Sequence, residues 1–166
     1  MALDILQPYA ALIFFLAALP FCLWAAYSDL SVMKIPNRLC LWMFVAFCVC
    51  AILILPWGAF GVRLIAAAVA LVIGFLLNMG GLVGGGDAKF VTAMIPFVAP
   101  GDYGPFLLMA CVTTLAAVFT HRMFVRTLTT GHVAENWKSW SEKKYFPMGL
   151  ALAGSLIFYQ LWVLLT

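Results

Sequence analysis

Charged residues are scarce in this chain. Only 9% of its 166 residues are Asp, Glu, Lys or Arg, whereas a soluble domain has about 25%, and 66% of the residues are hydrophobic. A soluble fold is therefore excluded, and apolar stretches near the span length of about 20 residues recur along the sequence. The composition predicts an all-α, polytopic integral membrane protein in which residues 1–166 form a single membrane-embedded domain.

Several signatures of enzymes and binding proteins are also missing. The five cysteines include no C-x-x-C pair, which argues against a zinc ribbon and against a disulfide framework. There is no H-E-x-x-H or G-x-S-x-G, and the glycine run at 80–86 lacks the Gly-Lys-Ser/Thr of a phosphate-binding loop. We therefore expect no metal, no cofactor and no nucleic-acid partner; the expected environment is the lipid bilayer.

Six apolar stretches are candidate membrane spans. The fourth is only 13 residues long, about 20 Å of helix, and contains Pro96. We expect its first residue, Asp87, to lie below the membrane surface, next to a wet cavity. The predicted spans are Tyr9–Tyr27, Leu39–Trp57, Phe60–Met79, Asp87–Ala99, Tyr103–Thr120 and Pro147–Leu165.

The basic residues indicate how these spans are oriented. Of the nine Lys and Arg, eight lie in the linkers after the first, third and fifth spans, and only Arg63 lies on the opposite side. Because basic linkers stay in the cytosol, both termini are predicted to be outside. The longest linker, 121–146, is predicted to lie on the cytosolic interface.

Acidic residues are few enough to be sorted by topology. Of the six, two lie on the outer side and two lie among the lysines of the longest linker. The remaining two, Asp29 and Asp87, end the first span and open the fourth. Both are therefore predicted to lie at the cytosolic face, at a comparable depth.

Two neighbouring carboxylates share a proton, so one can take a proton from water while the other donates one to a carbonyl oxygen. This chemistry hydrolyses a peptide bond without a covalent intermediate. The same pair could relay protons in a small proton-coupled transporter, or merely cap helices in a non-enzymatic assembly subunit. Asp87 opens a helix and Asp29 closes one, so the helix dipole predicts that Asp87 ionises more readily.

Two motifs contain these acids. Asp29 begins "DLSVMKIPNRL", in which an Asp is closely followed by I-P-N, and Asp87 stands in "GGGDAK", a G-x-G-D-x-K pattern. Together, at this spacing, they resemble the type IV prepilin peptidases. The resemblance implies a metal-free aspartic endopeptidase of the cytoplasmic (inner) membrane that removes the leader of prepilins or pseudopilins on the cytosolic side.

The resemblance also assigns roles to residues. It implies that Asp29 and Asp87 are the catalytic pair and that Gly84 and Gly86 let the substrate backbone approach Asp87, while Lys89 could bind an acidic group of the substrate. The cysteine-rich zinc-binding insertion of the larger members is missing. The chain therefore looks like the compact, peptidase-only branch that serves Flp-type (tight-adherence) pili, and no N-methyltransferase activity is expected.

Overall fold

The computed structural model describes residues 2–127, 137–141 and 146–166. Within these ranges every regular element is a helix, which confirms the all-α prediction. The linker predicted to lie on the interface falls partly outside the described residues, at 128–136 and 142–145. The helices are α1 (Ala2–Val32), α2 (Asn37–Ile54), α3 (Trp57–Met79), α4 (Gly85–Met94), α5 (Tyr103–Thr127), α6 (Lys138–Ser141) and α7 (Met148–Leu165), with 3₁₀ turns η1 (Ile95–Phe97) and η2 (Pro100–Asp102).

Five helices are long and apolar enough to cross a membrane, namely α1 from Tyr9 onwards, α2, α3, α5 and α7. A polytopic membrane protein is thereby confirmed, but the fourth predicted span is not a full-length helix. Its residues form the ten-residue α4, which continues only as the η1 turn. Pro96 is the reason, because it lacks an N–H and its ring clashes with the preceding helical turn.

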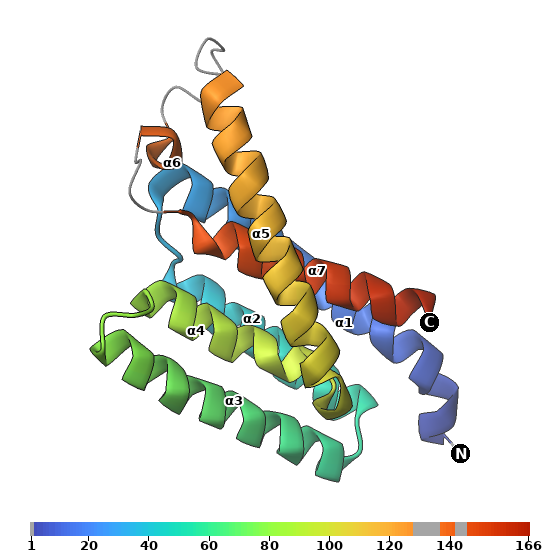
Figure 1. The fold of residues 1–166 in the computed structure, drawn as a ribbon. Coiled ribbons are helices and arrows are strands. Elements are labelled where there is room, and N and C mark those ends of the chain that lie inside the picture. The colour runs from blue at the N-terminus through green and yellow to red at the C-terminus, as the bar shows by residue number, and fades with distance from the viewer. Residues whose placement is uncertain (1, 128–136, 142–145) are drawn as a thin grey trace.

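The helices form two groups that meet around α1 and α2. In one group α4 lies between α2 and α3; in the other, α1 runs beside α7, which is crossed by α5 (Figure 1). Both chain termini lie at one end of the molecule. The last turn of α1, the first turns of α4 and α7, and the short α6 lie at the other end (Figure 1).

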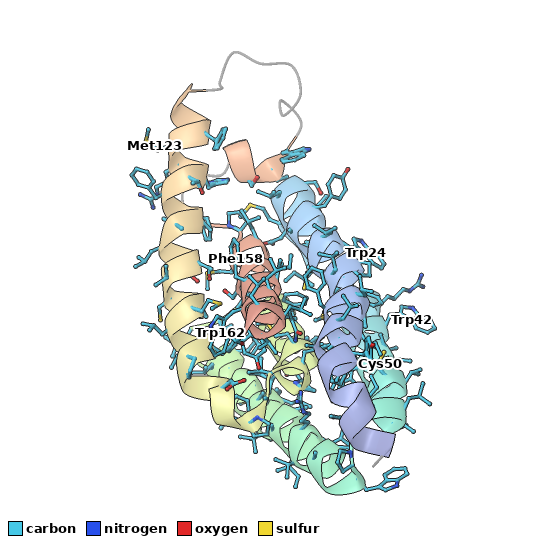
Figure 2. The ribbon with its side chains drawn as sticks, turned by 90° about the vertical axis from the view of Figure 1, so that its right-hand side faces the viewer. Trp24, Trp42, Cys50, Met123, Phe158 and Trp162 are labelled. Atoms are coloured by element: carbon cyan, nitrogen blue, oxygen red, sulfur yellow. The ribbon has the colours of Figure 1, made fainter. Side chains whose placement is uncertain are left out.

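An aromatic cluster joins α1, α2 and η1 in the core. The ring of Phe47 lies 5.7 Å from that of Phe14 and 5.3 Å from that of Phe97, and all three side chains are buried. The outer faces carry exposed apolar side chains instead, and Trp24 and Trp42 point away from the bundle (Figure 2). This distribution is what a helical bundle in lipid requires, since acyl chains solvate apolar side chains.

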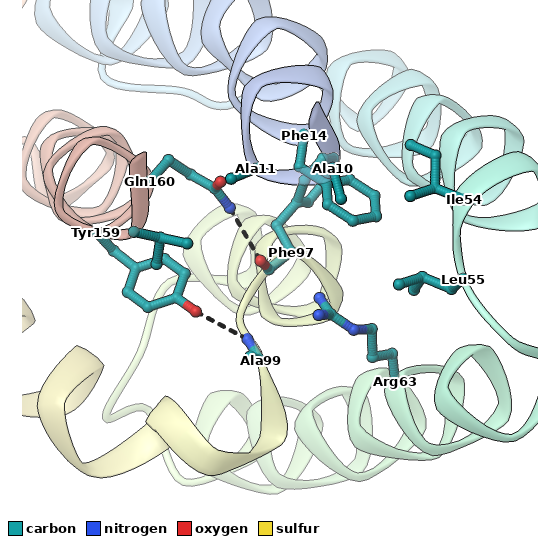
Figure 3. A pocket seen from close by; sticks show the side chains of 11 residues that line it. Ala10, Ala11, Phe14, Ile54, Leu55, Arg63, Phe97, Ala99, Tyr159 and Gln160 are labelled. Carbon is teal, nitrogen blue, oxygen red and sulfur yellow. Dashed lines mark hydrogen bonds between the residues drawn. The ribbon is translucent and has the colours of Figure 1, made fainter. Parts of the chain in front are cut away.

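The interrupted end of α4 is held by polar side chains from α3 and α7. Arg63 donates to the carbonyl of Pro96 at 2.7 Å. Figure 3 shows the second bond, in which Gln160 Nε2 donates to the carbonyl of Phe97 at 2.9 Å. Carbonyls at a helix end have no partner within the helix, and the bilayer core has no water to replace one. Arg63, the one basic residue that the sequence predicted on the outer side, therefore provides a donor to a carbonyl at the end of a short helix.

Tyr159 completes this arrangement. Its hydroxyl accepts the N–H of Ala99 at 3.0 Å and donates to Asp102 Oδ2 at 2.8 Å. A cavity of about 180 Å³ lies between these polar groups and the first helix (Figure 3). The chain after α4 is thus bonded to α7 at successive positions, and this fixes the C-terminal end of α4.

Gln160→Leu tests this anchor. Gln160 is buried, so the substitution leaves the Phe97 carbonyl without its donor and should lower the free energy of unfolding by about 1–3 kcal/mol. Reversible unfolding in mixed micelles measures the change. Thr120→Val removes an exposed hydrogen bond and is the control. Equal stability of the two variants would contradict the anchoring role.

Candidate active site

Asp29 lies in the last turn of α1 and is buried, with 6% of its surface exposed. Its Oδ2 accepts the N–H of Gly149, the second residue of α7, at 2.6 Å, and the N–H of Leu150 also interacts with the carboxylate. A Cβ at position 149 would lie 3.0 Å from Asp29 Oδ2 and 2.9 Å from Ile35 Cδ1. Only glycine therefore lets the start of α7 approach Asp29 so closely.

Asp87 lies in the first turn of α4 and is half-buried. A Cβ on Gly84 would lie only 2.7 Å from Asp87 Oδ2, so the glycine provides the space for this carboxylate. Burial, and then the charge of Asp29, raise the pKa of Asp87 to about 6. The structure thus brings the two acids close enough for their charges to interact, although they come from helices far apart in sequence.

The segment between α1 and α2 joins the surroundings of the two acids. Ile35, which packs near Gly149, also faces α4, where a Cβ on Gly86 would lie 3.5 Å from the Ile35 Cβ. Lys89 Nζ donates to Asn37 Oδ1 at 2.9 Å across 52 positions of sequence. The I-P-N segment and the G-x-G-D-x-K motif are therefore in direct contact.

Residues 12–119, more than half of the chain, match the type IV leader peptidase family. Asp29 and Asp87, with the segment that joins their surroundings, lie inside the matched residues. The chain belongs to the type IV leader peptidase family. It is thus a membrane-spanning member of a protease family, and the resemblance stated from the two motifs is confirmed. Comparison with curated proteins and with solved structures finds no match.

The three residues predicted to bind substrate in this family member all have partners within the protein. Gly84 faces the Asp87 carboxylate, Gly86 packs on Ile35, and Lys89 bonds to Asn37. Each contact builds the surroundings of Asp87. Contact with substrate remains a prediction for all three residues.

Gly149 was not found from the sequence. The only signal is the tripeptide Pro-Met-Gly at 147–149, where a proline precedes a helix and leaves the next backbone donors free. Nothing in that signal indicates which acid the helix start meets. The order of ionisation predicted from the helix dipoles considered Asp29 only as the end of α1. In the structure Asp29 also lies at the N-terminus of α7.

No candidate metal site accompanies the pair. In the part of the chain that the structure describes, no group of three or more His, Cys, Asp or Glu side chains could hold a metal ion. The polar groups at the site are the two carboxylates and the backbone N–H groups of Gly149 and Leu150.

The titration of Asp87 should depend on Asp29. Because its pKa is raised, Asp87 is protonated below about pH 6, and Asp29→Asn should move the midpoint lower by removing a negative charge. Burial persists in this variant, so the midpoint should stay above the ordinary value of 3.8. Carbon-13 NMR of labelled aspartate measures it. Asp102→Asn, at the far end of α4, should leave it unchanged, and an unshifted midpoint in Asp29→Asn would show that the acids do not interact.

Proposed function

We propose that this family member is an aspartic endopeptidase that removes the leader peptide of a prepilin or pseudopilin, with Asp29 and Asp87 as the catalytic residues. The observation that supports this most strongly is the meeting of these two acids from α1 and α4, within the residues that match the family. No other pair of acids in the described residues has its charges coupled in a comparable way.

The proposed reaction needs one water and one shared proton. One carboxylate takes a proton from the water as its oxygen attacks the scissile carbonyl carbon, and the other carboxylic acid protonates the carbonyl oxygen. When the tetrahedral species collapses, the C–N bond breaks and a proton passes to the leaving amine. The pair then returns to its starting state, so no covalent enzyme intermediate is formed.

The position of the acids suits a substrate held in the same bilayer. A prepilin presents an apolar helix that remains in the membrane, with its leader at the cytosolic interface. An enzyme with its acids at that depth meets the scissile bond without extracting the helix, because the shared bilayer already orients both molecules. We therefore propose a cytosol-facing site in the inner membrane, and Flp-type prepilins as the substrate class.

A proton-coupled transporter is the alternative that uses the same acids. A relay would need polar groups leading from Asp29 and Asp87 to the polar side chains at the other end of α4. The α4 side chains that face the core between Asp87 and η1 are Phe90, Ala93 and Met94, all buried and apolar. This arrangement favours the peptidase over the transporter.

Asp29→Asn and Asp87→Asn should each lower prepilin cleavage by at least about 100-fold, because each removes one partner of the proton exchange. The measurement is leader removal from a Flp-type prepilin by the enzyme in lipid nanodiscs, with Asp102→Asn as the control that retains activity. Processing by either Asp29→Asn or Asp87→Asn would falsify the proposal. In sealed vesicles, cleavage should require the prepilin leader to be on the cytosolic side.

Gly84→Ala tests the space beside Asp87. Residue 84 has φ −64°, which alanine adopts without strain, but its Cβ would displace Asp87 Oδ2. We expect the cleavage rate to fall about tenfold or more while the unfolding midpoint is unchanged, because only the end of a side chain must move. Gly101→Ala, at a position open to solvent or lipid, is the control. Full activity in Gly84→Ala would show that the carboxylate tolerates displacement.

A further inference from the structure

The first turn of α7 provides donors to only one member of the acid pair. The early N–H groups of a helix have no partner within it, and that of Gly149 is bonded to Asp29 Oδ2 at 2.6 Å. The Asp87 carboxylate accepts no hydrogen bond from any residue that the structure describes. The surroundings of the two acids are therefore asymmetric.

This asymmetry affects which acid carries the charge. A backbone donor stabilises a carboxylate relative to the neutral acid, and the N-terminus of the 18-residue α7 adds the favourable end of its dipole. The bond also fixes the rotation of the Asp29 carboxylate, because one of its oxygens is held by the main chain. Burial favours the protonated form of both acids, but Asp87 has no such donor and lies near the negative charge of Asp29, which further favours its protonated form.

We propose that Gly149 is a positioning residue whose N–H holds Asp29 as the carboxylate that activates water, so that Asp87 is the acid that protonates the scissile carbonyl oxygen. This inference rests on the proposed peptidase function. It reverses the order of ionisation expected from the helix ends in the sequence. Gly149 also lies beyond the residues that match the family, which end at 119.

The proton steps balance with these roles. Asp29 takes a proton from water while hydroxide oxygen bonds to the carbonyl carbon, and Asp87 gives its proton to the carbonyl oxygen. As the C–N bond breaks, protonated Asp29 gives its proton to the amine nitrogen. Asp87 regains one from a hydroxyl of the tetrahedral species, so both acids return to their initial states.

The chain contains a matched control for Gly149. Helix α3 starts with Pro-Trp-Gly at 56–58, and α7 starts with Pro-Met-Gly at 147–149, so each glycine is the second residue of a helix that follows a proline. A Cβ on Gly58 would meet nothing within 4 Å, whereas one on Gly149 would meet Asp29. A substitution at Gly149 therefore affects Asp29, whereas the same substitution at Gly58 leaves both acids untouched.

Replacing Gly149 with glycolic acid turns its N–H into an ester oxygen without adding a side chain. We expect kcat for a Flp-type prepilin in lipid nanodiscs to fall at least about tenfold with KM unchanged, because the lost donor acts on Asp29 and not on the substrate. The ester at Gly58 should leave both constants unchanged. A kcat at position 149 equal to that of the Gly58 ester would overturn the inference.

Carbon-13 NMR of labelled aspartate gives a second test, which needs neither a variant nor an activity measurement. In the unmodified protein at about pH 5, below the pKa of about 6 at Asp87, Asp29 should show the carboxylate shift and Asp87 the shift of the protonated acid. A neutral Asp29 beside a charged Asp87 would overturn the assignment even if the 149 ester failed to fold.

The peptidase function and the positioning role of Gly149 can be tested separately. Cleavage that survives Asp29→Asn would contradict the peptidase function itself. An inactive Asp29→Asn together with a fully active Gly149 ester would leave that function in place and remove only the role of α7.

Discussion

In the bilayer core, a backbone N–H or C=O without a partner in the protein has no water to bond instead. Helix α4 is the element most subject to this constraint, because it is too short to cross the membrane and both its ends lie against other helices. The carbonyls of Pro96 and Phe97, in the turn after its C-terminal end, are bonded by Arg63 and Gln160. Near its N-terminal end, Lys89 bonds to Asn37 at the start of α2. These bonds hold α4 near both of its ends.

Glycine has the same function beside each acid, although the two glycines differ in setting. Gly84 precedes Asp87 in sequence and leaves room for its carboxylate, while Gly149 comes from a distant helix and lets its N–H reach Asp29. A Cβ would lie 2.7 Å from Asp87 Oδ2 at position 84 and 3.0 Å from Asp29 Oδ2 at position 149. Space at the helix starts, and not backbone freedom, is what the glycines provide, since neither has a positive φ.

The sequence was sufficient for features that depend on local composition. The positions of the five long spans follow from apolar length, whereas the end of α4 at Met94, before Pro96, was not predicted. The grouping of Asp29 with Asp87 at one end follows from counting spans between them. Each of these needs only the order of residues along the chain and the thickness of the membrane.

Contacts between distant helices could not be predicted in this way. The bond from Gly149 to Asp29 joins residues 120 positions apart, and it depends on the rotation and tilt of α7 against α1. Side-chain packing sets these angles, so they cannot be predicted from the hydropathy of the sequence. Arg63 was recognisable as an isolated charge, but its partner, the carbonyl of Pro96 just beyond the end of α4, became evident only from the packed helices.

Helix α7 contacts both ends of this system and therefore sets its dimensions. Its first turn bonds to Asp29, and eleven residues later, about 16 Å along the axis, Gln160 bonds to the chain that follows α4. Asp29 and Asp87 lie on two separate helices, α1 and α4. Helix α7 bonds to Asp29 and to the chain that follows α4, so it contacts the surroundings of both acids. The distance between these two bonding positions on α7 therefore helps to set the position of Asp29 relative to the helix that contains Asp87.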